Sequence, residues 1–307
     1  MKSLNSILIR TVFLSMVVLF AFAACDPYTQ DGFEEQMVVE AFLTAGDPLP
    51  SVKLSKTLPF DQEYTFEAAA LSGLDVRLIR TTNSGATEAV LEYVESDQRG
   101  VYVAADESQT VTPGLVYRLE VREDPMSSPV LTSETFVPGD FDLISTNGNS
   151  FIYQGPDQFE PTFTISFYPG RQNYYVASTL ALDPDNFPLT PFYAGFLDED
   201  DDPDQFLRVS SGIINEGNYE INEDNTITIK LPWIAIAYYG PNEVSFYAID
   251  TNLYDYIRSL SIQLGGPSTL SPGQIENILW NVEGGIGIFG SRTGIISEIE
   301  VVNPFAH

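Results

Sequence analysis

Residues 74–79 read LDVRLI, with apolar and polar side chains in alternation. Successive side chains of a β-strand point to opposite faces, so this alternation predicts a strand with one face in a core. Six further short runs of this kind lie on either side of it, separated by turn residues such as Pro113-Gly114. These runs are 37–43, 52–54, 89–94, 101–104, 116–121 and 130–136.

Seven short strands within about 100 residues are typical of a β-sandwich. We therefore expect an immunoglobulin-like or transthyretin-like β-sandwich domain over residues 37–137. It lacks the cystine and the core tryptophan of antibody domains. Val137-Pro138-Gly139-Asp140 is rich in turn-forming residues and predicts a linker after this domain.

Residues 138–307 predict a larger β-rich domain with one or two short helices. A hairpin is expected around Pro169-Gly170, formed by strands at 162–168 and 174–182. Further strands are expected at 226–231, 244–249, 286–289 and 295–302. The fold class that follows is mainly β.

Four apolar residues at helical spacing predict an amphipathic helix near residues 252–264. They are Leu253, Tyr256, Ile257 and Leu260. Asp250 and Asn252 are both suitable N-cap residues, and Gly265-Gly266 is the expected stop. Pro272 is expected to open a second, short helical turn.

The N-terminus has the features of an export signal. Lys2 and Arg10 precede an apolar run from Val12 to Ala24 that only Ser15 interrupts, and a membrane-spanning helix would need roughly 20 apolar residues. Cys25 follows small residues and is the single cysteine. We expect residues 1–24 to be a signal peptide, Cys25 to be lipidated and residues 25–36 to form an acidic tether. The alternative is an ordinary signal peptide followed by a chance cysteine.

Charge and histidine content exclude several classes of function. The formal net charge is −29, so nucleic acid would be repelled and is not an expected partner. The single histidine, His307, is the last residue, where packing rarely fixes a side chain. Ser-His-Asp triads, Cys-His dyads and His-based zinc sites are therefore not expected. Carboxylate chemistry, binding of hard cations and a non-enzymatic role remain.

The densest acidic run contains Asp200, Asp202 and Asp204 in D-x-D-x-D spacing. Alternate carboxylates of this kind predict a candidate Ca²⁺ site, since calcium takes several oxygen ligands. An EF-hand loop starting at Asp200 would need Gly and Glu where Gln205 and Ser211 stand, so that motif is absent. The alternative is a solvated acidic loop.

Two other patterns have a functional and a structural interpretation. Residues 285–290 match G-x-G-x-x-G, but no strand-helix unit surrounds them, which favours a glycine-rich strand where backbones pack closely. Five aromatic residues could form a sugar-stacking platform or belong to the core. They are Phe192, Tyr193, Tyr238, Tyr239 and Trp280.

Several segments, in order along the chain, resemble one known family. They are Met37–Ala41, Val52–Thr57, Ser245-Phe246-Tyr247, Tyr254-Asp255-Tyr256, Ser271-Pro272, Asn277-Ile278 and Gly284–Gly290. Together they resemble the Bacteroidota-type outer-membrane lipoproteins of domain-of-unknown-function family 4249, over essentially the whole mature chain. The resemblance implies an outer-membrane lipoprotein encoded near TonB-dependent receptors, and it supplies no catalytic residues. Acidic residues after Cys25 are similar to surface-export signals of that phylum; they are Asp26, Asp31, Glu34 and Glu35.

We therefore expect a non-enzymatic binding or accessory lipoprotein of the cell envelope, exposed at the cell surface or facing the periplasm. Its partner would be a TonB-dependent receptor, and its ligand-binding residues are unknown. The alternatives are a carboxylate-dependent glycan hydrolase and a purely structural envelope component.

Overall fold

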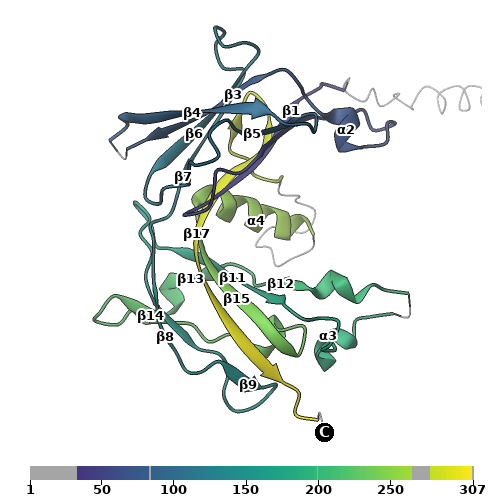
Figure 1. Ribbon diagram of the computed structural model, residues 1–307, viewed down its shortest axis with the longest axis vertical. Coiled ribbons are helices and arrows are strands. Elements are labelled where there is room, and N and C mark those ends of the chain that lie inside the picture. Colours follow the sequence, from purple (N-terminus) through teal and green to yellow (C-terminus); the bar gives the residue numbers. More distant parts are fainter. Residues whose placement is uncertain (1–32, 83, 199, 265–276, 306–307) are drawn as a thin grey trace, which may run out of the picture. The chain divides into compact units, whose positions relative to one another are not determined.

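The computed structural model describes residues 33–82, 84–198, 200–264 and 277–305 (Figure 1). Contacts divide the chain into two units, Met1–Glu35 with Pro59–Gln62 and Gln36–Leu58 with Glu63–His307. All described helices and strands lie in the second unit, and they make the protein mainly β as predicted. Cys25, His307, most of the tether and the turn expected at Pro272 lie outside the described residues. No helix in the described part is long and apolar enough to cross a membrane.

All seven strands predicted around residues 74–79 are present. They are β1 (Met37–Thr44), β2 (Val52–Lys56), β3 (Asp75–Thr81), β4 (Thr87–Glu95), β5 (Val101–Ala104), β6 (Val116–Arg122) and β7 (Leu131–Phe136). Hydrogen bonding joins them in the order β1-β2-β5-β4-β3-β6-β7. Two late strands extend this series, β17 (Ile286–Val302) along β1 and β16 (Val282–Glu283) along β7.

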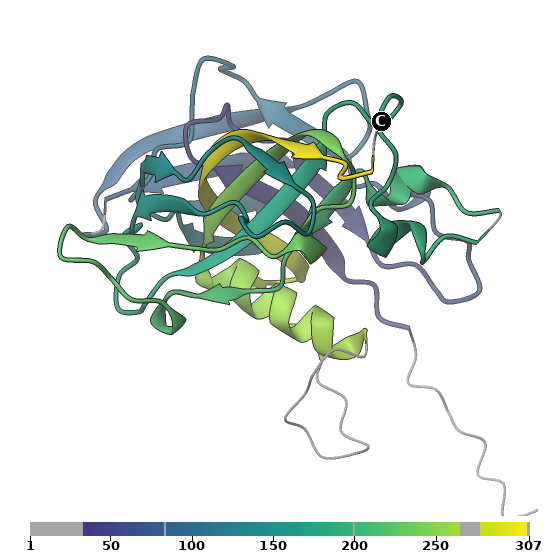
Figure 2. The ribbon, with the colours of Figure 1, turned by 90° about the horizontal axis from the view of Figure 1, so that it is seen from below.

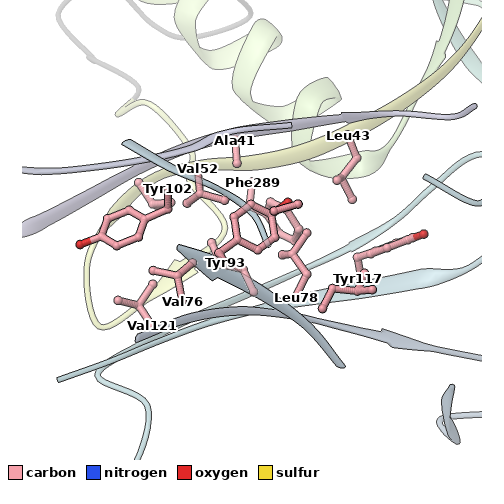
Figure 3. Close-up of a cluster of buried hydrophobic side chains, with 14 of the residues drawn as sticks. Ala41, Leu43, Val52, Val76, Leu78, Tyr93, Tyr102, Tyr117, Val121 and Phe289 are labelled. Atoms are coloured by element: carbon pink, nitrogen blue, oxygen red, sulfur yellow. The ribbon is translucent and has the colours of Figure 1, made fainter. Parts of the chain in front are cut away.

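These strands enclose the first core in a sandwich-like arrangement. Figure 3 shows Ala41 and Val52 pointing toward Val76 and Val121 from facing strands. Phe289 of β17 lies in the same cluster and is fully buried. The alternation that predicted the strands also decides which residues enter this core, because every second side chain faces inward.

A second core lies between two sheets. A three-stranded sheet contains β8 (Leu143–Thr146), β10 (Pro161–Thr164) and β14 (Thr226–Thr228). It faces the part of the larger sheet in which β15 (Gly240–Ile249) pairs with β17 and β11 (Tyr174–Ala181) pairs with β15. Three shorter strands complete this part of the sheet: β9 (Ser150–Ile152) pairs with β17, and β12 (Arg208–Ser210) and β13 (Ile214–Asn215) pair with β11.

The prediction of a hairpin around Pro169-Gly170 is wrong. β10 pairs with β8 and β14, whereas β11 pairs with β12, β13 and β15. β10 and β11 thus belong to different sheets, so the connection between them crosses from one sheet to the other. Within this connection the Ser166 hydroxyl donates to the Gly139 carbonyl. A Pro-Gly turn between two alternating runs has the same sequence pattern in either geometry.

β17 replaces the two closing strands predicted at 286–289 and 295–302. Its first half pairs in parallel with β1, and its second half pairs with β15 in antiparallel orientation. It therefore supplies side chains to both cores. The two expected domains, 37–137 and 138–307, thus share one strand, and their independence stays a prediction.

The helix predicted at 252–264 is α4 (Thr251–Gln263). Of its two candidate N-caps, Asp250 is the one used, since its carboxylate accepts a hydrogen bond from the Leu253 amide at 2.8 Å. Figure 2 shows α4 along one face of the sheet that contains β15 and β17. The remaining helices are single turns that the sequence patterns did not indicate. They are α2 (Phe66–Ala69), α3 (Pro191–Ala194), η1 (Pro203–Phe206), η2 (Glu216–Asn218) and η3 (Trp233–Ala235).

Candidate functional site

The face of β11, β15 and β17 that turns away from the second core carries a groove beside α4. Its volume is about 530 Å³, within the range of small-molecule sites. Six apolar residues line it, namely Phe42, Val176, Tyr247, Ile249, Leu253 and Ile257. Four polar residues complete the lining, namely Ser178, Arg208, Ser210 and Arg292. We call this the α4 groove.

Strand register brings these residues together from distant parts of the chain. Ile249 on β15 pairs with Arg292 on β17, and Thr44 on β1 pairs with the same arginine from the other side. Ser178 on β11 pairs with Ser210 on β12. Paired residues of neighbouring strands share a face, so the register places both arginines and the serines on one surface.

Arg292 is held by two contacts. Its Nε donates to the Thr44 hydroxyl at 3.0 Å, and its guanidinium carbon lies 4.1 Å from the centre of the Tyr247 ring. The Tyr247 ring in turn lies against Gly294, where an added Cβ would be 2.3 Å from the ring. The glycine therefore makes room for the tyrosine, and the tyrosine supports the arginine by a cation–π contact.

Arg208 reaches the same groove from the edge strand β12. Its Nη1 donates to the Ser178 hydroxyl at 3.2 Å, and Ser210 donates to that same oxygen at 3.4 Å. Arg208 is exposed, whereas Ser178 is buried. Neither Arg208 nor Arg292 forms an ion pair with a carboxylate in the part of the chain that the structure describes.

Behind the groove, Asp250 anchors α4. Its side chain is fully buried, and burial raises the pKa of this carboxyl to about 6 in spite of hydrogen bonds from Thr135 and Leu253. The Thr135 hydroxyl on β7 donates to Asp250 at 2.5 Å and also contacts the Ser291 hydroxyl at 2.7 Å. This polar network joins α4 to β7 and β17, and no sequence motif indicated it.

The candidate calcium residues lie on an exposed loop. Asp202 is engaged as the N-cap of η1, because its carboxylate accepts a hydrogen bond from the Asp204 amide at 3.0 Å. Across the described ranges, no three Asp, Glu, His or Cys side chains are placed to hold a metal ion together. The Ca²⁺ site of Asp200, Asp202 and Asp204 therefore stays a prediction from spacing.

The glycine-rich segment packs closely, as its structural interpretation predicted. A Cβ at Gly287 would lie 2.0 Å from the Val39 carbonyl oxygen, and one at Gly290 would lie 2.6 Å from the Leu253 side chain. Its context is the start of β17 and contains no helix N-terminus. The G-x-G-x-x-G match thus reflects strand packing.

The five aromatic residues do not form one exposed platform. Tyr193, Tyr238 and Tyr239 are buried in core clusters. Phe192 on α3 and Trp280, in the segment before β16, are the exposed members. The prediction that these five residues form a sugar-stacking platform is therefore wrong, because most of their rings are buried against other protein atoms.

Comparison with known proteins gives one strong match. The family model described as "Domain of unknown function (DUF4249)" matches residues 25–293. Among curated proteins, no match was found.

Solved structures that match include trypsin-activated alpha-2-macroglobulin from Escherichia coli and Salmonella alpha-2-macroglobulin reacted with methylamine. Both are 11% identical, with TM-scores of 0.20 and 0.22. They cover 71% and 88% of this chain, which spans only 14% and 15% of theirs. Likeness at this level supports no inference about fold or function. The family match, in contrast, extends over most of the sequence, and the protein belongs to the DUF4249 family.

Proposed function

We propose that this protein is a lipid-anchored binding module of the cell envelope, and that its ligand binds in the α4 groove. The observation that carries the proposal is the groove itself. Apolar side chains from β1, β11, β15 and α4 surround a space of about 530 Å³, and a few polar groups converge on it. This combination is typical of ligand sites, because apolar walls supply affinity and a few polar groups supply specificity.

The lining of the groove favours binding over hydrolysis. A glycan hydrolase needs two carboxyl groups on either side of the scissile bond. No aspartate or glutamate lines the α4 groove. A purely structural envelope component would have no need of a groove whose arginines lack a carboxylate partner among the described residues.

The envelope setting of this proposal comes from the sequence. Acylation of Cys25 would hold the acidic body at the outer membrane, and several acyl chains together make such attachment stable. The family match begins at the same residue. A TonB-dependent receptor is the proposed partner, to which the module would deliver its ligand.

A neutral dye tests the groove without assuming a charged ligand. Nile red should bind the mature chain carrying Cys25→Ser, and its fluorescence should rise. Val176→Trp should abolish this rise, because the indole fills the groove from β11. Ile144→Trp is the matched control, since it places the same ring on an exposed site of β8. Equal dye binding by both variants would refute the groove as the ligand site.

The partner is tested separately, in cells. The tagged, acylated protein should recover a TonB-dependent barrel from outer membranes after cross-linking. Recovery of the lipoprotein alone would refute this partnership and would leave the groove result unaffected.

A further inference from the structure

The α4 groove contains unpaired positive charge in a strongly acidic protein. Against 43 acidic residues the chain has only 14 lysines and arginines. Six of those basic side chains form ion pairs with carboxylates elsewhere in the described structure, namely Lys53, Arg77, Arg80, Arg118, Arg122 and Lys230. Arg208 and Arg292, which have no such partner, line the same groove.

The donors of these two arginines remain available. Arg171 is a useful contrast, because it also lacks an ion pair but donates to the Ile249 and Gln172 carbonyls and to the Thr251 hydroxyl. Among the residues that the structure describes, Arg292 donates a hydrogen bond from its Nε alone and Arg208 from its Nη1 alone. A guanidinium has five N–H donors in a fixed fork that matches carboxylate and phosphate oxygens.

We infer that the ligand of the α4 groove is a small organic anion with an apolar part, whose carboxylate or phosphate binds Arg292 and is attracted by Arg208. This inference rests on the proposed function, because it specifies the chemistry of the same site. The apolar part lies against Val176, Ile249 and Ile257. Anionic groups bind arginine by charge-assisted hydrogen bonds, which are stronger in an apolar setting.

The two arginines have different roles. Arg208 bonds to Ser178, whose partner on β15 is Ser245, two residues before the Tyr247 that supports Arg292. Strand spacings place the two guanidinium groups on the order of 10 Å apart. One acidic group therefore binds at a single arginine, and we assign this contact to Arg292, which Thr44 and Tyr247 hold in place. Arg208 adds attraction at the exposed end.

Tyr247 is a positioning residue in this arrangement. Its ring has Gly294 on one side and the Arg292 guanidinium close by. Tyr247→Phe retains the ring and should retain anion binding, whereas Tyr247→Leu should weaken octanoate binding and leave octanol binding unchanged.

Octanoate and octanol form the decisive pair of probes, because they share an apolar chain and differ in charge. In isothermal titration of the mature chain carrying Cys25→Ser, octanoate should bind at least about ten-fold more tightly than octanol, as expected for hydrogen bonds to a charged group. The quantity compared among the variants is this ratio of the two affinities. Arg292→Gln should reduce this ratio to about one, Arg292→Lys should give an intermediate ratio, and Arg208→Gln should reduce it less. Arg99→Gln is the control, since this arginine does not line the groove.

The outcomes separate the two proposals. Equal binding of octanol and octanoate, blocked by Val176→Trp, would overturn the anionic ligand and retain the groove as a binding site. Octanoate binding that survives both Arg292→Gln and Val176→Trp would place the anion elsewhere and also overturn it. Failure of Nile red, octanol and octanoate to bind would refute the proposed function itself.

The source of the anion is tested with vesicles of phosphatidylglycerol. The net charge of −29 repels an anionic bilayer, so we expect the free anion to be the ligand and the protein to stay in solution. Sedimentation of the protein with the vesicles, lost on Arg292→Gln, would instead assign the anionic group to a membrane lipid and overturn the free ligand.

Discussion

Asp250 is a buried carboxyl on which two opposing effects act. Burial disfavours the ionised form and raises the pKa of this carboxyl, and this effect is the larger one. The Thr135 hydroxyl and the Leu253 amide donate hydrogen bonds to the carboxylate, which favour the ionised form and lower the pKa. Because burial outweighs these hydrogen bonds, the pKa of Asp250 in the folded protein lies above its ordinary value.

Asp250→Asn should change how stability depends on pH. The pKa rises from 3.8 in the unfolded chain to about 6 in the folded protein, so the wild type loses stability as pH rises through this window and the loss is complete above it. The difference corresponds to roughly 3 kcal/mol. Asparagine cannot ionise and still caps a helix. The stability of Asp250→Asn relative to wild type should therefore increase between pH 4 and pH 7, measured by urea unfolding.

The control for this experiment is Asp250→Ala, which removes the cap and should be less stable than Asp250→Asn at both pH values. If the gap between Asp250→Asn and wild type were the same at pH 4 and pH 7, the raised pKa would be refuted.

Gly287 has a backbone conformation and a neighbour that both exclude a side chain. Its φ is 118°, and an added Cβ would lie 2.0 Å from the Val39 carbonyl oxygen. Gly287→Ala should therefore lower the free energy of unfolding by at least about 2 kcal/mol, through strain and displacement of β1 from β17. Gly212→Ala is the matched control, because no atom lies within 4 Å of its added Cβ. Equal stability of the two variants would contradict this account.

At the scale of elements, short-range pattern predicted most of the strands and the long helix. The runs between residues 37 and 136 alternate clearly, and their strands have one buried face. β17 could not be predicted as one strand, since Gly290–Gly294 contains no run of apolar residues. Its continuity depends on pairing with β1 and β15, which lie far away in the sequence.

A substitution at Phe289 tests how much β17 contributes to the stability of the first core. Its side chain is fully buried among residues of β1–β7. Phe289→Ala should lower the free energy of unfolding by about 3–5 kcal/mol, the usual effect of removing a buried ring. Ile296→Ala on the same strand should have little effect, because this side chain is 56% exposed. A small effect at Phe289 would mean that the first core is complete without β17.

At the scale of the molecule, the candidate site could not be predicted from the sequence. Its arginines lie on β12 and β17, and nothing near Arg208 or Arg292 in the sequence marks them as a pair. The sequence pattern instead predicted a Ca²⁺ site in the acidic loop, because the residues of that loop lie close together in the chain. Charges that act together across several strands become visible only when the register is known. Because acidic residues outnumber basic ones in this protein, two arginines without a carboxylate partner in the described structure indicate a site for an anion.

The proposed lipid anchor at Cys25 would determine where such a groove operates. If the cysteine is acylated, Cys25→Ser should move the protein from the membrane fraction to the soluble fraction, because a body of net charge −29 has no attraction of its own for an anionic bilayer. Mass spectrometry of the mature N-terminal peptide should show the added acyl chains in wild type. Asp26→Asn is the control and should remain acylated and membrane-bound. An unmodified thiol in wild type, or membrane association that persists in Cys25→Ser, would remove the lipid anchor, while the groove and its arginines would still predict an anionic ligand.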